Sequence, residues 1–269
     1  MEAFRAKKKF GQNFLKDEFY LNKIIESMSI LKKEIEAESN IELDVVEIGP
    51  GLGDLSIKIL DCFSLIAYEI DSELYLYLKD RFPRLKLYNK DVLSIPFNNN
   101  GWLHNKEYIL VSNLPYYIAT KIILNVLRDK LCRGMIVMTQ REVADKFCAK
   151  FNDSSFCAIS IITESISKSV SKIALVPPNA FSPIPKVEST IFAISKNNNY
   201  IDNEFESMIK KAFCSPRKKV IKNLSHIQNL DEILNKLNIS NNARAHQINT
   251  LQYHQIFNII KEEKWKEII

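Results

Sequence analysis

Short apolar runs alternate with amphipathic stretches through the first half of the chain. Five runs are nearly continuous in apolar residues: Val45–Ile48, Leu65–Ile70, Leu85–Tyr88, Tyr108–Val111 and Met135–Met138. Runs of this kind are typical of strands that are covered on both faces. The stretches between them carry apolar residues at helical spacing. This alternation predicts a doubly wound α/β sheet whose strands are mostly parallel.

The same pattern adds an element on either side of this parallel core. An amphipathic helix is predicted to begin near Asp17 and to run through Ile35, ahead of the first strand. After Met138, two further strand-like runs, Ser171–Val176 and Ser189–Ile194, flank a proline-rich loop. Two strands joined by such a loop predict a hairpin that closes the far edge of a seven-stranded sheet.

An asparagine-rich stretch then separates two parts of the chain. Residues 196–200 read KNNNY, and asparagine favours turns over helix or strand. Beyond this stretch the apolar residues follow a helical period and give no strand pattern. We therefore predict an α/β domain over residues 1–199 and a small all-α domain over residues 200–269.

Composition is consistent with this division and bears on location. The chain has 269 residues, 46% of them hydrophobic, which suits one large domain with a small one. No apolar run approaches the roughly 20 residues that span a bilayer, and the start, MEAFRAKKKF, lacks the apolar core of a signal peptide. We expect a cytoplasmic protein without a membrane partner.

The cysteines give no sign of a disulfide or metal framework. The five cysteines, at positions 62, 132, 148, 157 and 214, form no C-x-x-C pair and stand far from the four histidines at ligand spacing. An odd number of cysteines without a pairing pattern indicates reduced thiols that act as small core side chains. We expect no metal.

The positive charge is concentrated at the two ends of the chain. Residues 1–9 carry four cations and one anion, and residues 196–269 carry twelve cations and eight anions. Basic ends on a near-neutral domain suit a protein that grips RNA or DNA. At the first end, Arg5 and Lys7–Lys9 could clamp RNA or be disordered. Charge alone leaves a second interpretation equally open, in which the basic ends only keep the protein in solution.

A glycine-rich turn follows the first strand run, in the stretch EIGPGLGDL (47–55). Glycines at 49, 51 and 53 allow a sharp turn and a close approach of the backbone to a ligand. The dinucleotide-binding fingerprint needs a glycine where Asp54 stands, and this carboxylate would repel a pyrophosphate at the helix start. A P-loop is excluded because its G-K-[ST] sequence is missing. The turn therefore suits a ligand without phosphates.

Acidic residues stand at the ends of the first three strand runs. Glu69, on the second run, can accept hydrogen bonds from two ribose hydroxyls, and Asp91, after the third, from an adenine amino group. The implied ligand is an adenosine that carries a group other than phosphate. S-adenosylmethionine fits, with Glu47 near its ammonium group. Each acid by itself is more typical of a surface or capping carboxylate.

The stretch NLPY (113–116) follows the fourth strand run. Proline cannot donate to a sheet, so this turn ends the strand. If the adenosyl ligand lies across the first three strand ends, Asn113 faces its sulfonium. The side-chain oxygen of Asn113 and the main-chain carbonyl of Leu114 can accept the protons of an exocyclic amine, while Tyr116 stacks on the base. For this stretch alone, an ordinary proline turn is the alternative.

Together these motifs resemble the ribosomal RNA adenine N6-dimethyltransferase family, specifically its bacterial small-subunit branch, along essentially the whole chain. The matching stretches are KKFGQNFL (8–15), VVEIGPGLGDLS (45–56), EID (69–71), KDVL (90–93), SNLPYYIAT (112–120), QREVADK (140–146), AFSPIPKVES (180–189) and SPRKKVIKNL (215–224). The resemblance implies a Rossmann-like domain that transfers methyl groups from S-adenosylmethionine to N6 of two adjacent adenosines in the 3′-terminal hairpin of small-subunit rRNA. We further expect a role in ribosome biogenesis and a monomer that acts on rRNA within a pre-assembled small ribosomal subunit.

Residue by residue, the resemblance implies two sets of functional positions. Cofactor contacts fall on Asn13, Leu15, Gly49, Glu69, Asp91 and Asn113. Tyr116 and Phe181 are implied to face the target base, and prolines stiffen the loop around Phe181. The alternative for Phe181 is a core side chain under that loop. Two departures from the family pattern, Phe156-Cys157 for a Tyr-Gly pair and His246 for an acid, bear on local packing and on one ion pair.

Basic residues in CSPRKKVIKNL (214–224) are candidates for RNA binding. Ser215 followed by proline is typical of a helix start, which would place Arg217 and Lys218 in a first turn, where the macrodipole disfavours cations. That cost suggests a phosphate partner for these two and for Lys222, which shares a face with Lys218. A solvated charged face is the alternative.

Two other functions stay open at this point. One is related chemistry on large-subunit rRNA or on DNA adenine, and the other is a non-catalytic ribosome-assembly factor that kept the fold. Loss of the cofactor acids or of Asn113 would have favoured the assembly factor, and neither is lost.

Overall fold

The computed structural model describes residues 7, 11–97, 101–197 and 199–266, with side chains up to residue 262. The chain divides into two compact units. One unit combines residues 1–144 with 167–197, and the other combines residues 145–166 with 198–269.

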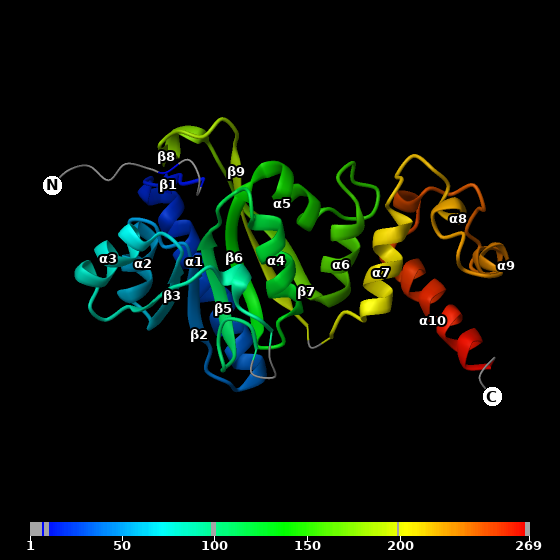
Figure 1. Ribbon diagram of the computed structural model, residues 1–269, viewed down its shortest axis with the longest axis horizontal. Helices are drawn as coiled ribbons and strands as arrows, with labels where there is room; N and C mark the ends of the chain where they lie inside the picture. Colours follow the sequence, from blue (N-terminus) through cyan, green and yellow to red (C-terminus); the bar gives the residue numbers. More distant parts are fainter. Residues whose placement is uncertain (1–6, 8–10, 98–100, 198, 267–269) are drawn as a thin grey trace. The chain divides into compact units, whose positions relative to one another are not determined.

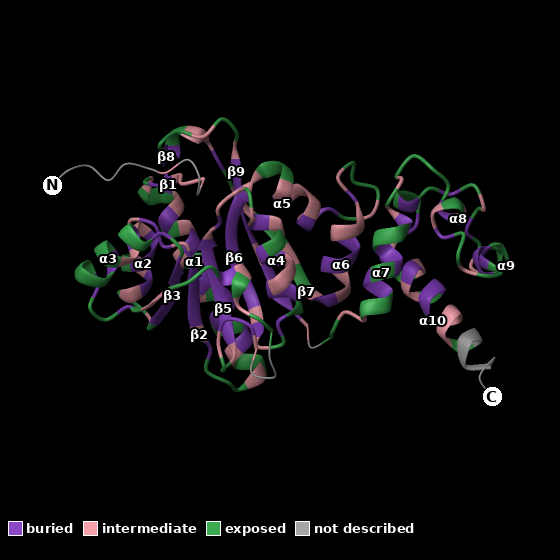
Figure 2. Cartoon of the chain, in the orientation of Figure 1, coloured by how far each residue is buried: buried purple, intermediate pink, exposed green. Residues whose placement is uncertain are grey.

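A seven-stranded sheet forms the centre of the first unit (Figure 1). In spatial order its strands are β4 (Lys86–Asn89), β3 (Leu65–Glu69), β2 (Asp44–Ile48), β5 (Tyr108–Asn113), β6 (Cys132–Gln140), β9 (Ser189–Lys196) and β7 (Ser167–Val176). The first five strands are parallel to their neighbours, and β9 is antiparallel to both β6 and β7. All residues of β3 are buried, and the strand is purple along its length in Figure 2. The predicted parallel sheet and the hairpin at its far edge are both confirmed.

Helices cover both faces of this sheet. They are α1 (Glu18–Ser39), α2 (Asp54–Leu60), α3 (Ser72–Arg81) and α4 (Ala119–Arg128). The predicted leading helix is confirmed as α1, and the Asp17 carboxylate caps it by accepting from the Phe19 N–H at 2.9 Å. Ile109 and Val111 of β5 share a core cluster with α1. The intervening Leu110 is equally buried and points to the opposite face, where Figure 1 shows α4.

A second, two-stranded sheet pairs β1 (Phe14–Leu15) with β8 (Phe181–Ser182). The strands are antiparallel, with Leu15 opposite Phe181. The sequence did not predict this pairing, because strands of two residues show no alternation of apolar and polar positions. The pairing ties the N-terminal segment to the loop that follows η3 (Pro178–Ala180) and precedes β9.

Helices make up the second unit in the part that is described. They are the end of α5 (Arg141–Cys148), α6 (Ala158–Ile166), α7 (Asn203–Ala212), α8 (Val220–Asn223), α9 (Leu230–Lys236), η4 (Ala245–Gln247) and α10 (Thr250–Lys266). The break between residues 197 and 198 lies inside the predicted linker. Segment 145–166 was predicted to belong to the first domain, but it groups here with the C-terminal helices. The reason is that Glu164 and Ser165 of α6 form hydrogen bonds with Thr250 and His254 of α10.

The helix predicted to begin at Ser215 begins instead at Val220, as α8. Residues 215–218 form a turn in which the Lys218 N–H donates to the Ser215 carbonyl at 2.9 Å. Asn223 holds this turn, because its Nδ2 donates to the carbonyls of Ser215 and of the last residue of α7, at 3.1 and 2.6 Å. The prediction was therefore wrong, and the macrodipole argument for a phosphate partner fails with it.

The cysteines form no disulfide, and their exposure varies. All five cysteines are free, but Cys62 and Cys214 are exposed, so the prediction that the cysteines act as core side chains is wrong for these two. Cys132 is buried. Among the residues described, no helix has the length and apolar character needed to cross a membrane.

Candidate active site

A cavity in the first unit opens at the carboxyl ends of the parallel strands. Strand β2 lies between β3 and β5, so the order of strands reverses there, and open α/β sheets bind ligands at such a point. Three segments line the cavity: residues 11–15, residues 47–52 after and at the end of β2, and residues 113–118 after β5. Glu69 and Asp91 also line it, from the end of β3 and from just after β4.

The glycine turn has the backbone conformation that its sequence predicts. Gly49, Gly51 and Gly53 have φ values of 66°, 62° and 82°, in the left-handed region. A Cβ on Gly51 would lie 2.8 Å from the Phe14 ring, so the turn also requires glycine for this close approach. Asp54, which begins α2 directly after the turn, pairs with Lys16 at 2.6 Å.

Glu47, at the end of β2, is a buried carboxyl that faces the cavity. It accepts a hydrogen bond of 2.6 Å from the hydroxyl of Ser56 on α2. Burial raises the pKa of Glu47 to about 8, against the lowering effect of this hydrogen bond. A carboxyl held so far from water is a favourable neighbour for a ligand that brings a positive charge.

Glu69, at the end of β3, is buried and lines the same cavity. Its Oε1 accepts from the Asp71 N–H at 2.9 Å and its Oε2 from the Gly51 N–H at 3.3 Å. Burial raises the pKa of Glu69 to about 7, although the two backbone hydrogen bonds lower it. These bonds fix the carboxyl, whose oxygens can still accept from hydroxyl groups of a ligand.

Asp91 has the capping role that a single strand-end acid commonly has, and it also lines the cavity. Its Oδ1 accepts from the Leu93 N–H at 2.9 Å at the start of η2 (Val92–Ser94). Tyr117 also lines the cavity, and burial together with the charges of Asp91 and Glu69 raises the pKa of its phenol. Tyr117 was not among the predicted site residues, although it stands in the stretch SNLPYYIAT.

Asn113, the last residue of β5, has its side chain fixed by the N-terminal segment. Its Nδ2 donates to the main-chain carbonyl of Asn13 at 2.9 Å, across 100 residues of sequence. Among the described residues the amide oxygen has no hydrogen-bond donor, so it is available as an acceptor. Leu114 follows, with its N–H bonded to the Met138 carbonyl at 3.0 Å. Asn13, Asn113 and Leu114 all line the cavity.

The two predicted base-contacting rings are placed differently. Tyr116 lines the cavity, and its hydroxyl forms a hydrogen bond of 2.7 Å with Ser189 Oγ at the start of β9. Phe181 does not line the cavity: its side chain is only 3% exposed and belongs to the core cluster. The cavity thus brings together the predicted cofactor residues, Leu114 and Tyr116, but not Phe181.

The predicted RNA-binding residues lie in the second unit. Arg217, Lys218 and Lys222 are exposed, and their side chains have no hydrogen bond or ion pair with another described residue. At the N-terminus, Arg5, Lys8 and Lys9 fall outside the described residues. Lys7 is described, and its ammonium pairs with Asp71 and Glu73 at 2.8 and 2.9 Å.

Comparison with known proteins decides the family. The model of the family described as ribosomal RNA adenine dimethylase matches residues 3–262. The chain belongs to this family. The ribosomal RNA small subunit methyltransferase A of Helicobacter hepaticus is 45% identical over 97% of this chain and 94% of its own. The protein of the same name in Sulfurimonas denitrificans is 43% identical over 97% and 96%.

Two solved methyltransferase structures share the fold. A dimethyladenosine transferase from Plasmodium falciparum superposes with a TM-score of 0.76 at 21% identity, covering 93% of this chain and 98% of its own. The 23S rRNA methyltransferase ErmE gives a TM-score of 0.69 at 20% identity, covering 92% and 99%. The predicted Rossmann-like fold is confirmed.

Membership in the dimethylase family confirms the family resemblance and the enzyme class. The chain is an rRNA adenine dimethyltransferase, and enzymes of this class take their methyl groups from S-adenosylmethionine. The cavity fits such a cofactor, because it combines two buried carboxyls and a glycine turn with an acid, Asp54, where a pyrophosphate would otherwise sit.

Proposed function

We propose that this enzyme transfers methyl groups from S-adenosylmethionine to N6 of two adjacent adenosines in the 3′-terminal hairpin of small-subunit rRNA, and that it serves ribosome biogenesis. The names of its relatives support the choice of the small subunit. The observation that carries the chemistry is the fixed amide of Asn113, whose oxygen remains an acceptor in the cavity that the two buried carboxyls also line.

Each cavity residue binds a different part of the cofactor. Glu69 accepts from the ribose hydroxyls, and Asp91 from the adenine amino group through the oxygen that does not cap η2. Glu47 lies near the ammonium group, where a positive charge would lower its raised pKa and favour the ionised carboxylate. The turn at Gly49 lets the ligand approach the backbone, and Asn13 and Leu15 complete the contacts.

The bound cofactor supplies an electrophilic methyl carbon. With S-adenosylmethionine held by the residues named above, each transfer would form a new N–C bond at adenine N6 as the S–C bond breaks, and N6 would release a proton to solvent. The amine is a poor nucleophile because its lone pair is delocalised into the ring. Acceptance of its protons by the Asn113 oxygen and the Leu114 carbonyl restores electron density on nitrogen, so the protein acts by positioning and by preorganised dipoles.

Tyr116 is the base platform in this proposal. Its hydroxyl forms a hydrogen bond with Ser189, which is fully buried on β9, so the ring is held in one orientation. A stacked, flipped-out adenine would then present N6 to Asn113. The family resemblance also implies a base contact for Phe181, but that contact would require its ring to leave the core.

The RNA surface is proposed on the second unit. Arg217, Lys218 and Lys222 are exposed cations without protein partners among the described residues, and such cations suit phosphate contacts. The proposed substrate is rRNA within a pre-assembled small subunit, and the proposed enzyme is a cytoplasmic monomer.

The test is methyl transfer to three substrates from a strain that lacks the modification: small subunits, their naked rRNA, and large subunits. Mass spectrometry of nuclease fragments then locates the product. We expect two dimethylated adjacent adenosines, formed on small subunits and not on large ones. Transfer confined to large-subunit RNA or to DNA would overturn the substrate assignment. A failure to bind S-adenosylmethionine in a calorimetric titration would overturn the proposed cofactor.

A further inference from the structure

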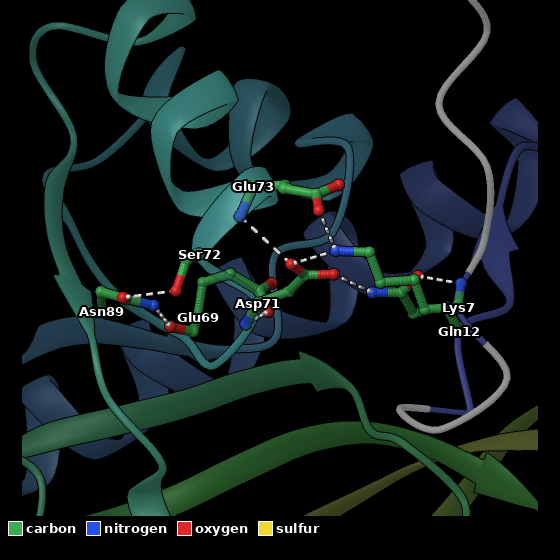
Figure 3. A network of polar contacts seen from close by, with 7 residues as sticks. All are labelled: Lys7, Gln12, Glu69, Asp71, Ser72, Glu73 and Asn89. Atoms are coloured by element: carbon green, nitrogen blue, oxygen red, sulfur yellow. Dashed lines mark hydrogen bonds and ion pairs between the residues drawn. The ribbon is translucent and has the colours of Figure 1, made fainter.

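Asp71 is a buried carboxylate that the proposed chemistry does not use. It follows β3, is 2% exposed and does not line the cavity. Its oxygens accept from Lys7 Nζ at 2.8 Å, from Gln12 Nε2 at 3.1 Å and from the Glu73 N–H at 3.1 Å. Figure 3 shows that the first two donors reach Asp71 from the N-terminal segment, whereas the third belongs to α3.

The N-terminal segment contributes directly to the cavity. Residues 11–15, which we call the strap, all line the cavity. The strap carries the Asn13 carbonyl that fixes the Asn113 amide. Its carboxyl end is held by the pairing of β1 with β8. Toward its amino end, the Gln12 side chain bonds Asp71, and its Oε1 also accepts from the Lys7 N–H at 2.7 Å. The strap is therefore held at both ends.

Asp71 also connects the strap to a cofactor residue. Its backbone N–H donates to Glu69 Oε1 at 2.9 Å, while its side chain binds Gln12 and Lys7. Burial raises the pKa of Asp71, but the hydrogen bonds from Lys7 and Gln12 outweigh it and hold this pKa below its usual value. The carboxylate is therefore charged at neutral pH and can hold both donors of the N-terminal segment.

We propose that Asp71 is a positioning residue that holds the strap over the cofactor cavity and, through Asn13, sets the orientation of the Asn113 amide. Ordering a segment of five residues costs conformational entropy. If Asp71 orders the strap before the cofactor arrives, a larger fraction of the protein is already in the binding-competent state. The apparent affinity for the cofactor rises in proportion to that fraction. A binding test of this proposal rests on the proposed cofactor, whereas a test on the ligand-free protein does not.

Asp71→Asn is the informative variant. Asparagine caps helices as well as aspartate does, so the start of α3 is retained. The charge that attracts Lys7 is lost, and the amide NH₂ cannot accept from Gln12. Glu73→Gln is the matched control, because it removes the ion pair between Glu73 and Lys7 and leaves Asp71 intact. Gln12→Ala is a second variant that removes the strap's own donor without altering α3.

Hydrogen exchange and calorimetry measure the two consequences. In the ligand-free protein we expect Asp71→Asn and Gln12→Ala to speed exchange of the amides of residues 12–15 by about tenfold, with exchange of β2 and β5 unchanged. The Kd for S-adenosylmethionine should rise by about tenfold in both variants and stay within about twofold in Glu73→Gln.

Two results would overturn the proposal. One is unchanged strap exchange in both variants, and the other is a Glu73→Gln variant with the same losses as Asp71→Asn. If Asp71→Asn unfolds, Gln12→Ala decides alone. If the unaltered protein does not bind S-adenosylmethionine, the proposed function fails, while the exchange comparison still decides the role of Asp71.

Discussion

For Asn113, a role in methyl transfer can be separated sharply from a role in cofactor binding. We expect Asn113→Ala to leave the Kd for S-adenosylmethionine within about tenfold and to cut single-turnover methyl transfer by about a hundredfold or more, because it removes an acceptor aimed at the reacting amine. The alanine also removes the donor to Asn13. Asn113→Asp loses that donor but keeps an acceptor oxygen, so it should transfer methyl groups faster than Asn113→Ala. Equal rates for the two variants, or near-normal turnover of Asn113→Ala, would contradict the acceptor role.

The buried carboxyls give the stability of the ligand-free protein a pH dependence with a definite sign. Burial raises the pKa of Glu47 to about 8, above the ordinary value of 4.5. The folded, ligand-free protein therefore holds a proton that the unfolded chain releases above pH 4.5. The stability that this proton contributes is complete below that pH, falls as the pH rises, and is lost once the pH passes about 8.

Glu47→Gln tests this, since glutamine keeps the shape and the acceptor for Ser56 but cannot ionise. Between about pH 5.5 and 8, the free energy of unfolding of the unaltered protein should fall relative to that of the variant, by up to about 1.4 kcal/mol per pH unit. Urea denaturation at several pH values measures the difference. The exposed Glu73→Gln is the control and should run parallel to the unaltered protein. A difference that does not change with pH for Glu47→Gln would show that this carboxyl is ionised throughout.

Residues of the site differ in how far the sequence could predict them. The lining acids and glycines were predictable, because their role follows from the position of each at the end of a strand run. Asp71 was quoted only as part of a motif, since nothing in the sequence shows that Gln12 and Lys7 of the N-terminal segment reach it. The burial of Phe181 also depends on a distant pairing, that of β8 with β1.

At the scale of elements, the sequence was informative where burial is continuous. Parallel strands that are covered on both faces read as unbroken apolar runs, and all seven strands of the main sheet were found. Short elements that depend on partners elsewhere in the chain were not predicted. Local signals at Ser215 indicated a helix start, but the helix begins only at Val220. There the Val220 N–H donates to the Ala243 carbonyl, so a contact beyond the reach of local propensity sets the boundary.

A pair of variants tests this boundary. If Ser215 were a helix cap, Ser215→Ala would cost about 1 kcal/mol of stability. We expect a change below about 0.5 kcal/mol instead, because its carbonyl and not its hydroxyl serves the turn. Asn223→Ala should cost about 1–3 kcal/mol, since it strips donors from two main-chain carbonyls. Urea denaturation followed by a probe in the second unit compares them, and a larger loss for Ser215→Ala would restore the helix cap.

For the whole molecule, the basic residues fall into two groups according to what each cation contacts. Some basic residues of the second unit are paired with acids, as Lys210 is with Glu206 and Lys261 with Asp202. Arg217, Lys218 and Lys222 lack such partners within the described part of the chain. Net charge alone could not distinguish these two groups. Phosphate contacts release condensed counterions, so only cations that touch RNA add to the salt dependence of binding.

The triple variant Arg217→Ala, Lys218→Ala, Lys222→Ala should therefore reduce the slope of log K against log salt for binding to small-subunit rRNA by about 2. The Kd for S-adenosylmethionine should stay unchanged, because the cavity belongs to the first unit. The charge control is Lys210→Ala with Lys261→Ala, which removes cations of the same unit that already have acidic partners. Filter binding or fluorescence anisotropy at several salt concentrations gives both slopes. An equal loss of slope in both variants would mean that the RNA responds to the overall charge of the unit, and the three unpaired cations would lose their proposed role.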